Sequence, residues 1–219
     1  MERLSKPSDI HWLSLRLDLS GATLRDFDLN SCLLRAGRFV QTTFEGRTSF
    51  FGAEFSDELD LSQAHFTGPA NFGMLDVNGR VTFSQAVFDA DANFGLANAR
   101  VLLFDDVAVT GDADMRFENL TVSASFADTS FQHDFALATG RATTFLNVGD
   151  VTVHGTLGWS EIGAAIVTNY ETVRLVDRSR PHRCPPGLQI DGATGKLVSA
   201  ETNAEPLNAK VVFDETPAT

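Results

Sequence analysis

The chain has 219 residues, with 17 lysines and arginines against 29 aspartates and glutamates, so its formal net charge is −12. An acidic surface repels the phosphate backbone, which excludes direct nucleic-acid binding as an ordinary function. The sequence has no run of 18 apolar residues and no signal-peptide pattern, so we expect neither membrane insertion nor export. The two cysteines lie far apart in the sequence, which favours a reducing, cytoplasmic compartment.

The N-terminal segment, residues 1–14, precedes any repeat and is predicted to form a cap. Pro7, Ser8 and Asp9 are typical of a helix start, and Trp12 would then cover the end of the structure that follows. From residue 15 onwards, large apolar residues recur at a step of five, at Leu19, Leu24, Leu29 and Leu34.

Between Phe39 and Phe94 the step alternates between five and six residues. The result is an eleven-residue repeat with two large apolar residues per unit, as in SQAHFTGPANF and SQAVFDADANF. This period is neither the 3.6 of a helix nor the 2 of a flat strand. Repeats this short are typical of stacked coils that bury their apolar side chains against one another. Small residues two positions earlier, such as Ala64, Ala70 and Ala86, point to the same side and support the register.

The ladder of apolar positions continues as far as Leu175. Its later members are Phe104, Val109, Met115, Leu120, Phe126, Phe131, Leu137, Ala142, Val148, Val153, Trp159, Ala164, Tyr170 and Leu175. Sorting every fourth position gives three bulky columns and one slim column, and the slim one holds Leu34, Phe55, Val77, Ala99, Leu120, Ala142 and Ala164. Three bulky walls and one slim wall would fill the interior without overpacking it.

The last part of the chain departs from the repeat. Trp159 and Tyr170 either fill the core or form an apolar terminal face for dimerisation. The prolines and arginines after residue 178 cannot continue a ladder, so residues 178–219 are predicted to be a C-terminal tail. Within this tail a small hairpin is expected, with Asp191-Gly192 as its turn.

The repeat resembles that of the pentapeptide-repeat family, whose consensus is roughly Ala-Asp/Asn-Leu/Phe followed by two variable residues. The resemblance covers about residues 15–175 and is carried by GATL, GAEF, QAHF, PANF, QAVF and DANF, in a Phe-rich form with alternating steps of five and six. The β-helix domain is predicted over residues 15–177. It implies an all-β, quadrilateral β-helix of roughly seven coils with four ladder residues in each coil, closed by terminal caps. Some members of this family are dimeric acidic rods that resemble duplex DNA and protect type II topoisomerases.

Two acidic columns follow from the register. One consists of Asp106, Asp128 and Asp150, and the other of Asp91, Asp112 and Asp134. In each column the carboxylates should lie about 4.8 Å apart, one coil after another. They imitate a phosphate track for a protein partner, bind cations, or are corner residues chosen for turn geometry and solubility. Calcium is the less favoured alternative, because the glycine-rich nonapeptide of calcium-binding β-rolls is absent.

Catalytic chemistry has little support in the sequence. It contains no Ser-His-Asp elbow, no phosphate loop and no cysteine cluster, and no histidine pair has metal-ligand spacing. We therefore expect no catalytic residues, no metal site and no cofactor.

The predicted function is a non-enzymatic protein-binding module, with an acidic DNA mimic acting on DNA gyrase or another topoisomerase as the leading hypothesis. Residues 44–135 support it, because they carry four basic and fifteen acidic groups, a net charge of −11. The alternative is a structural scaffold that mediates assembly through its ends or its tail, with a homodimer formed at the C-terminal end.

Overall fold

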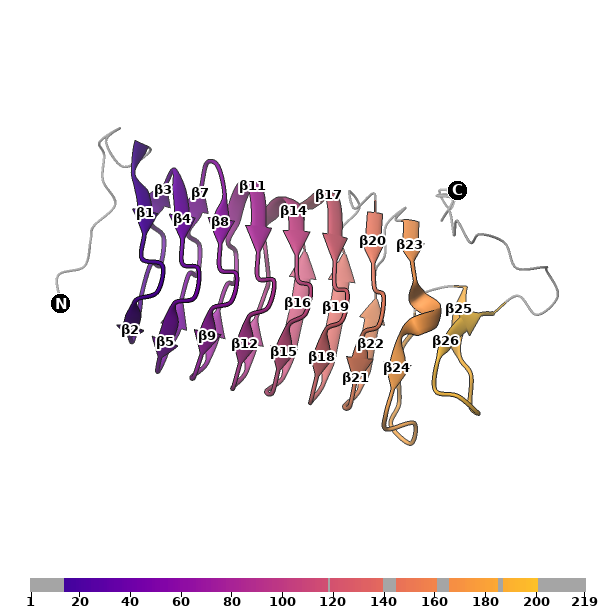
Figure 1. The fold of residues 1–219 in the computed structure, drawn as a ribbon. Helices are drawn as coiled ribbons and strands as arrows, with labels where there is room; N and C mark the ends of the chain where they lie inside the picture. The colour runs from indigo at the N-terminus through magenta and orange to yellow at the C-terminus, as the bar shows by residue number, and fades with distance from the viewer. Residues whose placement is uncertain (1–13, 118, 140–144, 161–165, 185–186, 201–219) are drawn as a thin grey trace.

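The computed structural model describes residues 14–117, 119–139, 145–160, 166–184 and 187–200. In this part the chain forms short parallel β-strands, one 3-10 helix, η2 (Tyr170–Thr172), and a terminal antiparallel pair. The parallel strands stack coil on coil into a rod that runs from β1 at one end to β24 at the other, with β25 and β26 beyond it (Figure 1). The predicted all-β solenoid is therefore confirmed.

One long face of the rod is an eight-stranded parallel sheet. Its strands, in order along the rod, are β2 (Thr23–Arg25), β5 (Thr43–Glu45), β9 (His65–Phe66), β12 (Val87–Phe88), β15 (Ala108–Val109), β18 (Ser130–Phe131), β21 (Thr152–Val153) and β24 (Arg174–Leu175). Seven steps of ~4.8 Å between these strands give a rod about 34 Å long.

A second face is a six-stranded parallel sheet. It consists of β6 (Thr48–Ser49), β10 (Ala70–Asn71), β13 (Ala92–Asn93), β16 (Ala113–Phe117), β19 (Phe135–Thr139) and β22 (Leu157–Ser160).

The two remaining sides of the coil merge into a single ten-stranded sheet. Its strands are β1 (Arg16–Asp18), β3 (Leu33–Leu34), β4 (Ala36–Arg38), β7 (Glu54–Phe55), β8 (Leu59–Asp60), β11 (Asp76–Thr82), β14 (Asn98–Leu103), β17 (Asn119–Ser125), β20 (Phe145–Asn147) and β23 (Ile166–Thr168). The longer strands β11 and β14 continue past the corner between the two sides, and their pairing shifts register between Val77 and Arg80. This shift absorbs the single place where the spacing of the ladder is one residue short, from Ala99 to Phe104.

The predicted inward positions form the core. Phe66 pairs in register with Phe44 in one neighbouring coil and with Phe88 in the other. The three rings stack almost parallel, with centroids 4.6 Å and 4.5 Å apart, and all three are at most 1% exposed. In the slim column Leu34 pairs with Phe55, which pairs with Val77 in the next coil. Side chains of one column therefore lie directly above one another, as the sequence predicted.

Most of the described positions two residues before the ladder are also buried, and they are not all small. On the side that begins at β1 they are large in several coils, since Leu59, Val81, Leu102 and Leu146 are at most 1% exposed. Elsewhere the same positions hold alanine, as at Ala64 and Ala86. These aliphatic residues contribute a second layer of apolar side chains to the core.

Two buried threonines allow a direct comparison of a hydrogen-bonded hydroxyl group with one that has no partner. Thr42 and Thr48 both have 0% exposure, but only the Thr42 hydroxyl donates a hydrogen bond, to the Leu19 carbonyl at 2.9 Å. Among the described residues, Thr48 Oγ1 has no partner. Because a buried hydroxyl without a partner is costly, we expect Thr48→Val to be neutral or to stabilise by up to about 1 kcal/mol. Thr42→Val should instead destabilise by about 0.5–1.5 kcal/mol.

Urea denaturation of both variants measures this difference. The backbone N–H of Ala22 also donates to the Leu19 carbonyl, so that oxygen keeps one partner in Thr42→Val. Equal losses of unfolding free energy in the two variants would contradict the assignment of Thr48 as the unsatisfied hydroxyl.

An antiparallel pair, β25 (Leu188–Ile190) and β26 (Leu197–Ser199), lies against the last coil. The Leu175 N–H donates to the Gly195 carbonyl at 3.0 Å, and Leu197 is fully buried. The connection is longer than the two-residue turn predicted at Asp191-Gly192, since the Asp191 N–H donates to the Lys196 carbonyl and Gly195 has a φ of 70°. This pair covers the C-terminal end of the rod. The predicted cap at residues 1–14 lies outside the described residues, apart from Ser14.

Candidate functional site

The first acidic column lies at the corner that precedes the eight-stranded sheet. Asp106, Asp128 and Asp150 are exposed and have φ values of 57°, 58° and 56°. This left-handed conformation is one that aspartate tolerates better than most residues. Turn geometry is therefore sufficient to explain why aspartate stands at these corners.

Glutamines occupy the same corner in the earlier coils. Gln41 Nε2 donates to Gln63 Oε1 at 2.9 Å, and Gln63 Nε2 donates to Gln85 Oε1 at 2.7 Å. Gln85 Nε2 then donates to Asp106 Oδ2 at 3.4 Å. The side chains at this corner thus change from hydrogen-bonded amides to carboxylates between Gln85 and Asp106.

The carboxylates beyond Asp106 differ from those glutamines. In the part of the chain that the structure describes, the side chains of Asp128 and Asp150 take part in no hydrogen bond or ion pair. Like charges one coil apart repel each other, so this end of the row lowers stability unless a cation or a basic partner lies over it.

The second acidic column lies at the corner between the eight-stranded and six-stranded sheets. Each carboxylate accepts a hydrogen bond from the backbone of the next coil. Asp91 Oδ1 accepts from the Asp112 N–H at 2.9 Å, and Asp112 Oδ1 accepts from the Asp134 N–H at 3.2 Å. Asp134 Oδ1 accepts from the Thr156 N–H at 2.7 Å. Unlike the first column, these aspartates connect successive coils and have a structural role.

The last member of this column also contacts the C-terminal segment. Arg180 Nη1 lies 3.1 Å from Asp134 Oδ1, and Arg180 Nε lies 3.0 Å from Asp177 Oδ2. The pKa of the Asp134 carboxyl is lowered, first by the hydrogen bond from the Thr156 backbone and further by the charges of Arg180 and His133. The Asp134 carboxylate is therefore held in its ionised form.

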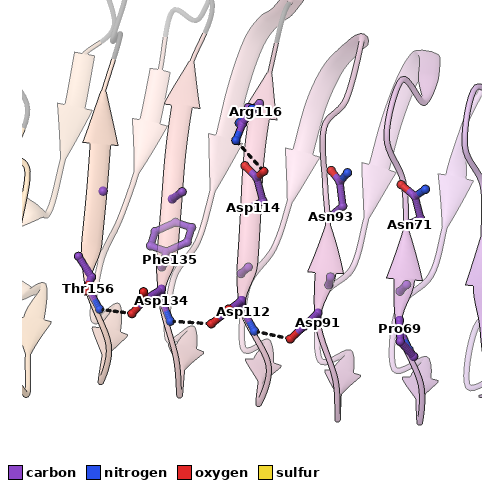
Figure 2. A pocket seen from close by; sticks show the side chains of 15 residues that line it. Pro69, Asn71, Asp91, Asn93, Asp112, Asp114, Arg116, Asp134, Phe135 and Thr156 are labelled. Atoms are coloured by element: carbon purple, nitrogen blue, oxygen red, sulfur yellow. Dashed lines mark hydrogen bonds and ion pairs between the residues drawn. The ribbon is translucent and has the colours of Figure 1, made fainter.

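A groove of about 590 Å³ follows the outer face of the six-stranded sheet along the rod. Figure 2 shows the linked row of Asp91, Asp112 and Asp134 along one side of it. Asp114 and Arg116 lie on the other side and form an ion pair of 3.0 Å. Neither residue was predicted as part of a site, although Asp114 directly precedes the ladder position Met115 and so has an outward phase.

Trp159 and Tyr170 are not part of an exposed terminal face. Their exposed fractions are only 3% and 8%, and the antiparallel pair β25–β26 lies beyond them. Of the two alternatives for these residues, their burial agrees with core filling and does not agree with an exposed face. A homodimer through the C-terminal end stays a prediction. The ladder spacing placed both residues at inward positions, where they lie.

Among the described residues, no group of three or more histidine, cysteine, aspartate or glutamate side chains is arranged to hold a metal ion. Cys32 and Cys184 are free thiols, and burial raises the pKa of both. No helix among these residues is long and apolar enough to cross a membrane.

Comparison with protein families matches one model, described as pentapeptide repeats, over residues 29–74 and 50–98. Neither the comparison with curated proteins nor the comparison with solved structures finds a match. The matched residues are the coils in which phenylalanines stack in register, and the same coil geometry continues on both sides of them. Residues 29–98 therefore match the pentapeptide repeats, and the described chain folds as a β-solenoid consistent with the β-helix of that family.

Proposed function

We propose that this protein is a non-enzymatic binding module that presents rows of carboxylates to the basic surface of a DNA-binding protein, such as DNA gyrase or another topoisomerase. The observation that supports this most directly is the exposed end of the first acidic column. Asp128 and Asp150 repeat once per coil, and their side chains have no partner among the described residues.

The mechanism of docking is electrostatic. A rod that carries most of a net charge of −12 on one stretch would be steered toward a groove that normally holds DNA. Each exposed ion pair contributes little by itself, about 0–1 kcal/mol, so several carboxylates in a rigid row are needed for useful affinity. Added salt should weaken such binding because it screens charges over about 10 Å at 0.1 M.

A pull-down from bacterial lysate at low and at high salt tests this proposal. The bait proteins are the wild type and the triple variant Asp106→Asn, Asp128→Asn, Asp150→Asn. We expect the wild type to recover a topoisomerase or another DNA-handling protein at low salt only, and we expect the triple variant to lose it. Asparagine tolerates the left-handed corner, so the variant should remain folded.

A second triple variant controls for net charge. Glu54→Gln, Glu58→Gln and Glu171→Gln remove three exposed carboxylates that lie outside both acidic columns. This variant should still capture the partner. Equal loss of the partner in both triple variants would reject the corner row as the binding surface.

The alternative function is a scaffold that binds its partner through an end of the rod or through the tail. At the C-terminal end such binding would involve the tail and not the last coil, because Leu188 and Leu197 of the antiparallel pair are buried against that coil. Removal of residues 178–219 would expose that end, so the appropriate truncation comes after Ala200. Loss of the partner on this truncation, with no effect of the corner asparagines or of salt, would favour the scaffold.

A further inference from the structure

The groove on the six-stranded sheet extends over five coils of the rod. It crosses β10, β13, β16, β19 and β22, so at ~4.8 Å per strand it is about 19 Å long. Outward-facing Asn71, Asn93 and Asp114 occupy one row in its first three coils. In the next two coils the same row holds Ala136 and Gly158. The floor is therefore low and apolar toward the C-terminal end.

The charge of the groove is strongly negative. Its lining includes Asp91, Asp112, Asp114 and Asp134 against the single cation Arg116, a local net charge of −3. An apolar floor beside a row of carboxylates suits lysine and arginine side chains, which lay their methylene stems on apolar surface and direct the charged end to an acid.

The chain itself shows this kind of contact at one end of the groove. The guanidinium of Arg180, which follows the last coil in sequence, reaches back to Asp134. This contact is independent of the bonds that connect the column internally, because it comes from a segment outside the repeat. An arginine of another chain would find the same chemistry at Asp112, one coil away, and a second carboxylate beside it at Asp114, which shares its charge with Arg116.

We propose that this groove binds an extended basic segment of a partner protein, about six residues long. At ~3.3 Å per residue, such a segment matches the length of the groove. Its arginines or lysines lie on the row of carboxylates, and its backbone crosses the floor at Ala136 and Gly158. Arg180 occupies the C-terminal end of this surface and competes with the segment there.

This inference deepens the proposed function, on which it rests for the protein nature of the partner. Its test uses a purified peptide and no lysate, so the groove and the proposed function can be rejected independently of each other. Loss of the pull-down partner in the corner variant without any peptide binding would reject only the groove. Peptide binding with no salt-sensitive partner in the lysate would reject only the proposed function.

The probe is a fluorescein-labelled hexapeptide of alternating arginine and alanine, blocked at both ends. Its fluorescence anisotropy is followed as full-length protein is added at low salt. We expect saturable binding to the wild type and none for the same peptide with citrulline in place of arginine. The double variant Asp112→Asn, Asp114→Asn should bind roughly 2- to 30-fold more weakly, as expected for two exposed ion pairs.

Two further variants show whether the groove, and not net charge, is responsible. Glu54→Gln with Glu171→Gln removes the same charge elsewhere and should leave the affinity within about twofold of the wild type. Gly158→Leu keeps the charge and fills the floor, and it should also weaken binding. A Cβ at residue 158 meets its nearest neighbours only at 3.9 Å, so this substitution should be tolerated. No binding to the wild type, or equal loss in the two charge variants, would overturn the proposal.

Arg180→Gln tests the competition directly. It frees Asp134, so we expect the peptide to bind about 2- to 5-fold more tightly. Arg25→Gln makes the same change in net charge at the other end of the rod, where Arg25 pairs with Glu45 at 2.7 Å. Equal responses of these two variants would overturn the placement of the peptide at Asp134.

Discussion

Phe66→Ala is expected to lower the unfolding free energy by about 3–5 kcal/mol, as measured by urea denaturation followed by circular dichroism. Phe66 has 0% exposure and stacks between Phe44 and Phe88. It also makes an edge contact with Phe72 at a centroid distance of 5.7 Å. Removal of this ring leaves a cavity bounded by three rigid aromatic neighbours, which cannot collapse into it without breaking the register of the coils.

Phe51→Ala provides the matched control. Phe51 directly follows Phe50 on the ladder, but it points outward and is 43% exposed. Its loss should change the unfolding free energy by no more than about 0.5 kcal/mol. A similar cost for the two variants would mean that the ladder is not the source of stability.

Gly111→Ala is expected to destabilise by about 1–3 kcal/mol or more, although it adds only one methyl group. Gly111 lies at a corner where a Cβ would collide with the backbone of Ala90 and Asp91 in the preceding coil. Backbone atoms cannot move aside as a flexible side chain would. The coils must therefore separate locally, which strains the hydrogen bond from the Asp112 N–H to Asp91.

A second glycine tests whether space, and not glycine itself, sets the cost. At Gly192 a Cβ would have no atom within 4 Å, and the backbone there has no positive φ. Gly192→Ala should stay within about 0.5 kcal/mol of the wild type in the same denaturation experiment. If Gly111→Ala were equally mild, the close approach of the coils at this corner would be contradicted.

Most of the fold was predictable because every inward position is subject to the same constraint. A side chain such as Phe66 must fit between its equivalents in two neighbouring coils, so the period of large apolar residues reports the register directly. The same reasoning left two alternatives open at Trp159, because position near the end of a repeat says nothing about what covers that end. The covering pair β25–β26 belongs to a segment without any period.

The groove could not be predicted from the repeat for a related reason. Outward positions need only be compatible with solvent. The change from Asn93 and Asp114 to Ala136 and Gly158 therefore does not alter the spacing of the large apolar residues from which the fold was predicted. The contact between Arg180 and Asp134 depends on the path of the tail after the last coil. The two acidic columns were visible in sequence, but their different roles required the backbone bonds that only one of them accepts.

Because the coils pair in register, the length of the rod can change by one whole coil at a time. Val87 and Phe88 pair with His65 and Phe66, so each of these neighbours is 22 residues away in the sequence. Gain or loss of one such unit by duplication or deletion would return every side chain to the same phase, and the rod would change by ~4.8 Å. The number of exposed carboxylates can therefore change in evolution by the gain or loss of a whole coil, while the inward residues of the other coils stay the same.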